Sequence, residues 1–195
     1  MTTFLLIRHG LTDAVGKAIT GRLPGVHLND TGRKQADELP ARLAGWKIDA
    51  IASSPLERAL ETADPLARRT QLKVSAFDAL DEVDFGVWSG LTIEQLNQLP
   101  EWRLYNTFRS STRAPGGELA TEVQTRMVAV LAGLARQHPE QTVAAFSHAD
   151  PIRLALVHFL GMPVDLMHRL EIRPASVSVV RLADWGPQVV SINTL

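Results

Sequence analysis

Short apolar runs alternate along this chain with longer segments in which apolar residues recur every three or four positions. The first pattern predicts buried strands and the second predicts amphipathic helices. Strands are expected over residues 4–7, 48–52, 72–77 and 142–146, followed by two C-terminal strands at 176–182 and 189–192. Strands that alternate with helices predict an α/β fold, a three-layer αβα sandwich whose mostly parallel central sheet carries helices on both faces.

Cap and turn residues indicate where the helices begin. Asn29 is suited to cap the first helix, and Pro40 near its end is expected to kink or locally unwind it. Gly116 and Gly117 interrupt the chain before the longest helical pattern. The later helices are expected at about 55–69, 93–99, 102–108, 118–137 and 152–160.

Two helix starts have specific cap signatures. Ser54 is followed three residues later by Glu57, which forms the pattern of a capping box, and Pro55 fits the first helical position. Asp150 is expected to cap another helix, with Pro151 as its first residue. Both starts follow directly on predicted strands, so they lie at one edge of the sheet.

Basic and imidazole side chains occur at three of these strand-to-helix junctions. Arg8 and His9 follow the first strand, Arg58 follows the second, and His148 follows the strand at 142–146. The carboxyl ends of parallel strands share one edge of a sheet, which is where α/β proteins bind ligands. Arg58 in the first turn of a helix is mildly disfavoured by the helix dipole, which points either to a bound anion or to pairing with a nearby carboxylate. The sequence therefore predicts an anion site at this edge.

Composition limits the other possibilities. The chain has 195 residues, of which 45% are hydrophobic, with a net charge of −1 and no cysteine. A single domain with a sizeable core is expected. A nucleic-acid or membrane partner is not expected, and the absence of a long apolar segment favours a cytoplasmic location. The histidines lack the spacing of a metal motif such as His-Glu-x-x-His.

Six short motifs occur in a fixed order along the chain. They are Leu6-Ile7-Arg8-His9-Gly10 with Thr12, Leu28 to Ala36, Ser53 to Ala63, Leu80 to Gly90, Pro115 to Glu118, and Ser147 to Arg153. In this order they resemble the histidine phosphatase superfamily, which includes cofactor-dependent phosphoglycerate mutases and many small bacterial phosphatases. Each motif alone is common, whereas the ordered set is specific and spans most of the chain.

The resemblance implies a role for each basic side chain at the sheet edge. His9 would be the nucleophile that becomes phosphorylated, while Arg8, Arg58 and His148 would hold the phosphoryl oxygens. Glu82 would be the proton donor. These residue types suit the chemistry, because an alkoxide leaving group needs an acid and planar guanidinium groups bind phosphoryl oxygens in pairs. The resemblance implies no metal and no cofactor.

Two positions leave alternatives open. Glu82 is flanked by Asp81 and Asp84, so this segment could instead be a solvated acidic loop. Val15 stands where many members of the family have an Asn that contacts the phosphate, which predicts one hydrogen bond fewer or one supplied by another group.

Residues 85–115 correspond to a segment that covers the substrate in relatives, here called the excursion. The residues expected to contact substrate are Thr12, Thr20, Gly21, Arg22, Trp88, Trp102 and Tyr105. For all of these but Thr12 there is an alternative interpretation: an ordinary loop turn for the Thr20-Gly21 pair, a solvated cation for Arg22, and packing within the excursion for the aromatic residues.

The leading hypothesis is a metal-independent phosphomonoesterase that acts on a small phosphorylated metabolite through a phosphohistidine. One alternative is a phosphoglycerate mutase, although the chain is short for one and lacks the paired arginines that mutases use around their substrate. The other is a catalytically silent protein that only binds phosphorylated ligands. The sequence is compatible with a monomer or a homodimer.

Overall fold

A six-stranded sheet forms the centre of the computed structural model, which describes all residues 1–195. The strands are β1 (Thr2–Arg8), β2 (Ala50–Ser53), β3 (Val74–Ala76), β4 (Thr142–Ser147), β5 (Val177–Ala183) and β6 (Gly186–Thr194). Their order is β3-β2-β4-β1-β5-β6. The pairs formed among the first four are parallel, whereas β5 is antiparallel to both β1 and β6. The predicted αβα sandwich with a mostly parallel sheet is confirmed.

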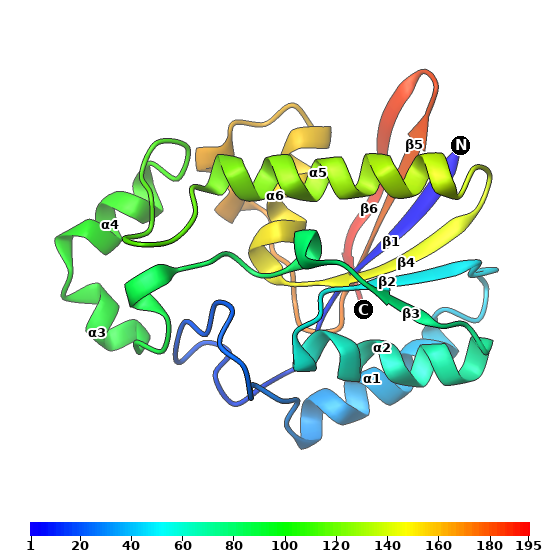
Figure 1. Ribbon diagram of the computed structural model, residues 1–195, viewed down its shortest axis with the longest axis horizontal. Coiled ribbons are helices and arrows are strands. Elements are labelled where there is room, and N and C mark those ends of the chain that lie inside the picture. Colours follow the sequence, from blue (N-terminus) through cyan, green and yellow to red (C-terminus); the bar gives the residue numbers. More distant parts are fainter.

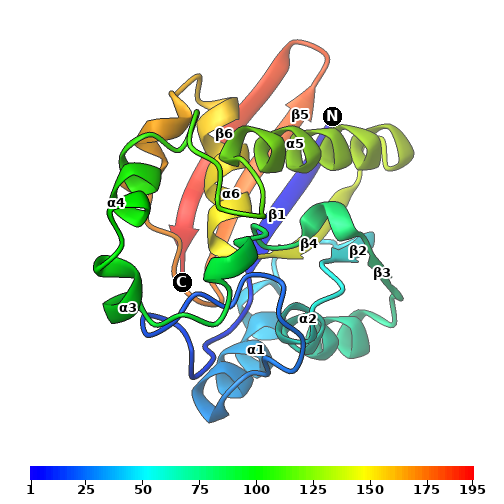
Figure 2. The ribbon, with the colours of Figure 1, turned by 60° about the vertical axis from the view of Figure 1, so that its left-hand side comes forward.

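Helices cover both faces of the sheet (Figure 1). The α-helices are α1 (Asp30–Arg42), α2 (Glu57–Thr70), α3 (Ile93–Asn97), α4 (Pro100–Thr107), α5 (Ala120–Gln137) and α6 (Ala149–Phe159). Short 3-10 helices occupy Asp78–Leu80, Gly86–Trp88 and Val164–Arg169. The pair α1 and α2 lies against one face and the pair α5 and α6 against the other, as the turned view makes clear (Figure 2).

The layers follow from the alternation of side chains along the strands. In β1, Leu5 and Ile7 pack with Leu39 of α1, whereas Phe4 and Leu6 pack with side chains of α5 and α6. All of these residues are fully buried. Because successive side chains of a strand point to opposite faces, a continuous apolar run is the expected sequence of a strand covered on both sides.

Three local predictions about helices are wrong. The helix expected from Pro55 begins at Glu57, because Ser54 uses its hydroxyl for contacts with other segments and does not cap it. The last long helix begins at Ala149, so Asp150 is its second residue and not its cap. Pro40 does not interrupt α1, which continues to its end at Arg42.

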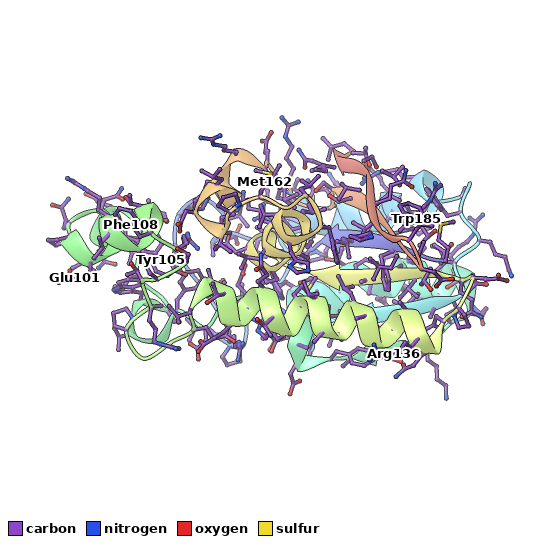
Figure 3. The ribbon with its side chains drawn as sticks, turned by 90° about the horizontal axis from the view of Figure 1, so that it is seen from above. Glu101, Tyr105, Phe108, Arg136, Met162 and Trp185 are labelled. Carbon is purple, nitrogen blue, oxygen red and sulfur yellow. The ribbon has the colours of Figure 1, made fainter.

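The excursion lies beyond one end of the sheet and has a hydrophobic cluster of its own. Phe85, Trp88, Trp102 and Tyr105 form this cluster with residues of α5 and α6. Figure 3 shows Glu101, Tyr105 and Phe108 of the excursion at the end of the molecule opposite Trp185, which lies in the turn between β5 and β6.

Backbone contacts hold the two ends of the excursion together. The N–H of Val87 donates to the carbonyl of Pro115 at 3.0 Å, and the N–H of Glu118 donates to that of Asp84 at 2.8 Å. Gly86 makes this approach possible: it has φ of +53°, and a Cβ there would lie 2.1 Å from the Pro115 oxygen. Only glycine fits such a position without displacing the backbone.

Candidate active site

Strand pairing brings the two predicted catalytic histidines together. Arg8 is paired with Ser147 in the register of β1 and β4, so the next residue of each strand is a histidine. The N–H of His9 donates to the Ser147 carbonyl at 3.0 Å, which continues the pairing by one step. The imidazole rings of His9 and His148 are consequently 5.1 Å apart between centroids.

A cavity of about 170 Å³ opens at this edge of the sheet. Its lining residues come from the end of β1, the loop that follows it, α2, the loop around Glu82, and the first turns of α3 and α6. They are Arg8, His9, Thr12, Ala14, Val15, Gly16, Ala18, Ile19, Thr20, Gly21, Arg58, Glu82, Phe85, Ile93, Ala149, Asp150 and Arg153. Four of the five predicted catalytic residues therefore face one space, while His148 is fully buried beside His9.

Two arginines of the cavity have guanidinium groups that the protein satisfies only in part. Arg8 donates from Nη1 to the carbonyl of Ile172 at 2.7 Å, and Arg58 donates from Nη2 to that of Gly21 at 2.7 Å. Nε of Arg8 and Nη1 of Arg58 are buried and have no partner. Burial lowers the pKa of both guanidinium groups from their usual value. Buried cations with unused donors favour an anionic ligand, because an anion would satisfy both the charge and the donors.

His9 is held in one orientation by the residue that follows it. Its Nδ1 is 2.7 Å from the carbonyl oxygen of Gly10, which can only accept a hydrogen bond. Nδ1 therefore carries the proton, and in the neutral ring Nε2 has a free lone pair. Burial first, and then the nearby Arg8 and Arg58, hold the pKa of His9 well below its usual value. The neutral, nucleophilic form is thus favoured in the empty cavity.

The pKa of Glu82 is shifted in the opposite direction from that of His9. Burial and the neighbouring carboxylate of Asp150 raise its pKa to about 7, although Arg58 and Arg8 act against this. Its carboxyl group accepts one hydrogen bond from the N–H of Val83 at 3.0 Å. A carboxylic acid with a pKa near 7 can hold a proton at neutral pH and can also release it, as a general acid requires.

Asp150 is a cavity residue that the sequence did not identify, because the residue pattern made it look like a helix cap. Its carboxylate accepts from Arg109 at 2.9 Å and from Arg153 at 2.8 Å. Arg109 belongs to the excursion, is 2% exposed, and also lies 4.2 Å from the centre of the Tyr105 ring. Burial acts to raise the pKa of Asp150, yet the two guanidinium groups hold it well below its usual value. This ion pair connects the excursion to α6.

A chain of hydrogen bonds runs from His148 away from the cavity. Nε2 of His148 is 2.9 Å from the hydroxyl of Ser54, and this hydroxyl donates to Oδ1 of Asp81 at 2.6 Å. The N–H of Ser54 donates to the carbonyl of Phe146 at 2.9 Å, which extends the pairing of β2 with β4 and fixes the serine beside His148. Nδ1 of His148 is buried and has no partner.

The residues expected to contact substrate separate into two groups. Thr12, Thr20 and Gly21 line the cavity, as does Val15. Arg22 does not: it donates from Nε to the carbonyl of Glu82 at 3.0 Å and forms an ion pair with Glu118 at 2.8 Å. Arg22 therefore supports the loop that carries Glu82.

The three aromatic residues expected to contact substrate also lie outside the cavity lining and pack against one another. Trp88, Trp102 and Tyr105 have ring centroids 5.3 to 5.7 Å apart and are at most 9% exposed. None of them lines the cavity, so the structure places all three in the packing of the excursion. Phe85 and Ile93 supply the apolar wall from this part of the chain.

Other features of the molecule do not compete with this site. A larger groove of about 760 Å³ lies between α1 and α2, but two pairs of its residues already contact each other, Asp64 with Arg68 at 2.9 Å and Glu61 with His27 at 2.5 Å. No cluster of three or more His, Cys, Asp or Glu side chains has the geometry to hold a metal ion. None of the helices combines the length and the apolar character needed to cross a bilayer.

Known proteins resemble this chain in sequence and in fold. The sequence model of the histidine phosphatase superfamily (branch 1) matches residues 4–195. Phosphoserine phosphatase 1 of Hydrogenobacter thermophilus is 29% identical over 99% of this chain and 92% of its own. A mutant phosphoserine phosphatase from Entamoeba histolytica, solved with phosphoserine, is 27% identical, with a TM-score of 0.89 over 99% of this chain and 97% of its own. The structure of Bacillus stearothermophilus YhfR, 24% identical, superimposes with a TM-score of 0.93 over 100% and 98% of the two chains and shows the shared fold.

Proposed function

Since the chain belongs to the histidine phosphatase superfamily and is a phosphatase, we propose that it hydrolyses a small phosphomonoester through a phosphohistidine formed on His9. In this proposal His9 is the nucleophile and Glu82 is the proton donor. Arg8, Arg58 and His148 hold the phosphoryl group. The observation that carries it is the state of His9: a neutral ring whose free Nε2 shares a cavity with two guanidinium groups that have unused donors.

The first step transfers the phosphoryl group to the enzyme. Nε2 of His9 attacks phosphorus, the bond from phosphorus to the alcohol oxygen breaks, and the proton of Glu82 passes to that oxygen. The negative charge on the remaining phosphoryl oxygens is stabilised by Arg8 and Arg58. The carbonyl of Gly10 holds the Nδ1 proton of His9 and stabilises the cationic phosphohistidine.

The second step regenerates the enzyme. The Glu82 carboxylate takes a proton from a water molecule as the water oxygen attacks phosphorus, the bond to Nε2 of His9 breaks, and inorganic phosphate leaves. Glu82 returns to its protonated form, so one residue serves as acid and then as base. A pKa of about 7 suits both tasks at neutral pH.

The cavity supports a small substrate. Its volume of about 170 Å³ leaves space for little more than a phosphoryl group and a leaving group of a few atoms. Ile19, Phe85 and Ile93 give that part of the cavity an apolar wall. We expect small metabolites to be better substrates than phosphorylated proteins or nucleic acids.

The test is release of phosphate from para-nitrophenyl phosphate in the presence of EDTA, with the wild type compared with His9→Ala. A matched control is His27→Ala, because His27 is an exposed histidine that does not line the cavity. We expect activity in the wild type and the control and none in His9→Ala. A brief incubation with substrate followed by denaturation should trap an acid-labile, alkali-stable phosphoprotein in the wild type only.

Two outcomes would contradict the proposal. A protein that binds phosphate but never forms the phosphoprotein would be a silent binder. A phosphoprotein that returns its phosphoryl group to phosphoglycerate, with isomerised product and little inorganic phosphate, would be a mutase.

A further inference from the structure

We propose that Asp81 and Ser54 are positioning residues that act through His148, and that they couple binding of the phosphoryl group to uptake of one proton by the chain Asp81–Ser54–His148. This inference rests on the proposed function in placing the phosphoryl group beside His9 and against Nδ1 of His148. Glu82 and His9 take part in the chemistry, whereas Asp81 and Ser54 would not contact the substrate.

The contacts of the Ser54 hydroxyl determine where the protons lie in the empty site. Its single proton is directed to Oδ1 of Asp81 at 2.6 Å. It can therefore only accept at its 2.9 Å contact with Nε2 of His148, so Nε2 carries a proton. The N–H of Leu56 also donates to the Ser54 hydroxyl oxygen, at 3.2 Å. His148 is then neutral with a bare Nδ1, which agrees with the lack of a partner for that buried atom.

A phosphoryl group in the cavity favours a proton on Nδ1 of His148. Phosphoryl oxygens accept hydrogen bonds, so a bare Nδ1 would face them with lone pair against lone pair. A proton on Nδ1 removes this repulsion. The chain can then hold its extra proton in two ways: as a doubly protonated His148 with ionised Asp81, or as a protonated Asp81 that donates to Ser54 while Ser54 donates to Nε2. Both forms contain one proton more than the empty chain, so the coupling does not depend on which predominates.

Charges around the chain explain why the extra proton is absent before ligand binds. His148 is faced by Arg58 from α2, by Arg8 at the end of β1 and His9 just after it, and by Arg126 from α5. Burial and these groups hold the pKa of His148 well below its usual value. A dianion in the cavity would oppose the same positive charges and favour protonation.

The other end of the chain has a mixed environment. Asp81 is faced by Arg22 from the loop before α1, by Arg126 from α5, and by Asp78 from the preceding 3-10 helix. Burial raises the pKa of Asp81, while its bond from Ser54 and the two arginines lower it. Asp81 is 7% exposed, so its charge acts on the chain with little screening by solvent.

Asparagine at position 81 should remove the uptake of a proton while it keeps the hydrogen-bonded arrangement of Ser54 and His148. The side chain of Asp81→Asn can turn its amide so that N–H donates to Ser54, which lets Ser54 donate to Nε2 and leaves a neutral His148 with its proton on Nδ1. The anion would then bind without uptake of a proton. Asp78→Asn is the matched control, because Asp78 is an exposed neighbouring acid that does not contact Ser54.

The experiment uses sulfate, which has the shape of phosphate and remains a dianion throughout the range of pH. Sulfate affinity is measured from pH 6 to 9 in the double variant His9→Gln/Glu82→Gln, which removes the two other titrating groups at the anion. We expect the dissociation constant to rise with pH in this background, by up to about tenfold per pH unit, and equally with Asp78→Asn added. With Asp81→Asn added it should be independent of pH.

Nitrogen-15 spectra of the histidine rings give an independent reading in the otherwise unaltered protein. We expect free His148 to carry its proton on Nε2 and to gain a proton on Nδ1 when sulfate binds. A flat pH dependence in the double variant, or an Nδ1 that stays bare with sulfate bound, would overturn the coupling. Because sulfate is not hydrolysed, either result is independent of whether a phosphohistidine forms.

Discussion

Replacement of Glu82 by glutamine should make the protein less active and, at alkaline pH, more stable. The unfolded chain releases this proton near pH 4.5, whereas the folded protein retains it until about pH 7. Below pH 4.5 both states are protonated and the residue has no effect on stability. As the pH rises from 4.5 to 7, Glu82 lowers the free energy of unfolding progressively. Above pH 7 the folded state contains an ionised carboxylate that is partly removed from water, and the loss of stability is complete.

The magnitude follows from the two pKa values. The interval from 4.5 to about 7 corresponds to roughly 3 kcal/mol at 1.36 kcal/mol per pKa unit. Glu82 is only half-buried, so solvent reduces this figure, and we expect a gain of about 1–3 kcal/mol for Glu82→Gln at pH 8. At pH 4.5 the two proteins should differ by much less, because glutamine resembles the protonated acid.

Urea unfolding of both proteins at pH 4.5 and pH 8 measures the stability change. The catalytic effect is measured as kcat/KM, which reports transfer of the phosphoryl group to the enzyme, with two substrates. A general acid contributes about 10²–10⁴-fold, and the loss in kcat/KM should be larger for an alkyl phosphate than for para-nitrophenyl phosphate, whose leaving group needs less protonation. The wild-type rate should fall above pH 7, and the variant should lack this limb. Equal destabilisation of the variant at both pH values, or equal loss with both substrates, would refute the assignment of Glu82 as a buried general acid.

Three further substitutions test the surroundings of the site. Arg109→Met should destabilise the protein by about 1.5–3 kcal/mol in chemical unfolding, because it removes one of the two arginine bonds to the carboxylate of Asp150 while the bond from Arg153 remains. An unchanged midpoint would show that this ion pair is dispensable. Gly86→Ala should lower the free energy of unfolding by more than about 2 kcal/mol, since a Cβ there would meet the Pro115 oxygen. A loss of stability no larger than that of a substitution in an exposed loop would contradict the close approach of Gly86 to Pro115. Trp102→Phe should lower the thermal midpoint but leave KM unchanged, and a raised KM would restore this residue to the substrate site.

The layers of the fold were predictable because they depend on local patterns. The uninterrupted apolar residues of β1 indicated a strand covered on both faces, and the structure buries Phe4 and Leu5 on opposite sides of the sheet. The placement of Arg8 and His9 followed from the same pattern, because they come where that strand ends.

What escaped prediction depends on contacts between distant segments. Ser54 matches a capping box by its neighbours, yet its hydroxyl bonds Asp81 and lies beside His148, so α2 begins later. Asp150 likewise resembles a cap, but two arginines bind its carboxylate. One error occurs in the cavity wall and the other behind it, beside His148, where side chains that ordinarily satisfy helix ends are used for longer-range contacts.

The joined ends of the excursion have an evolutionary consequence. The hydrogen bonds from Val87 to Pro115 and from Glu118 to Asp84 close the segment on itself, and its aromatic residues pack against one another as well as against α5 and α6. Such a segment is a cassette: another of different length or composition can replace it while the spacing of the strands beneath stays the same. Selectivity for the alcohol can therefore diversify, in nature or in the laboratory, through exchange of one insert on an unchanged hydrolytic platform.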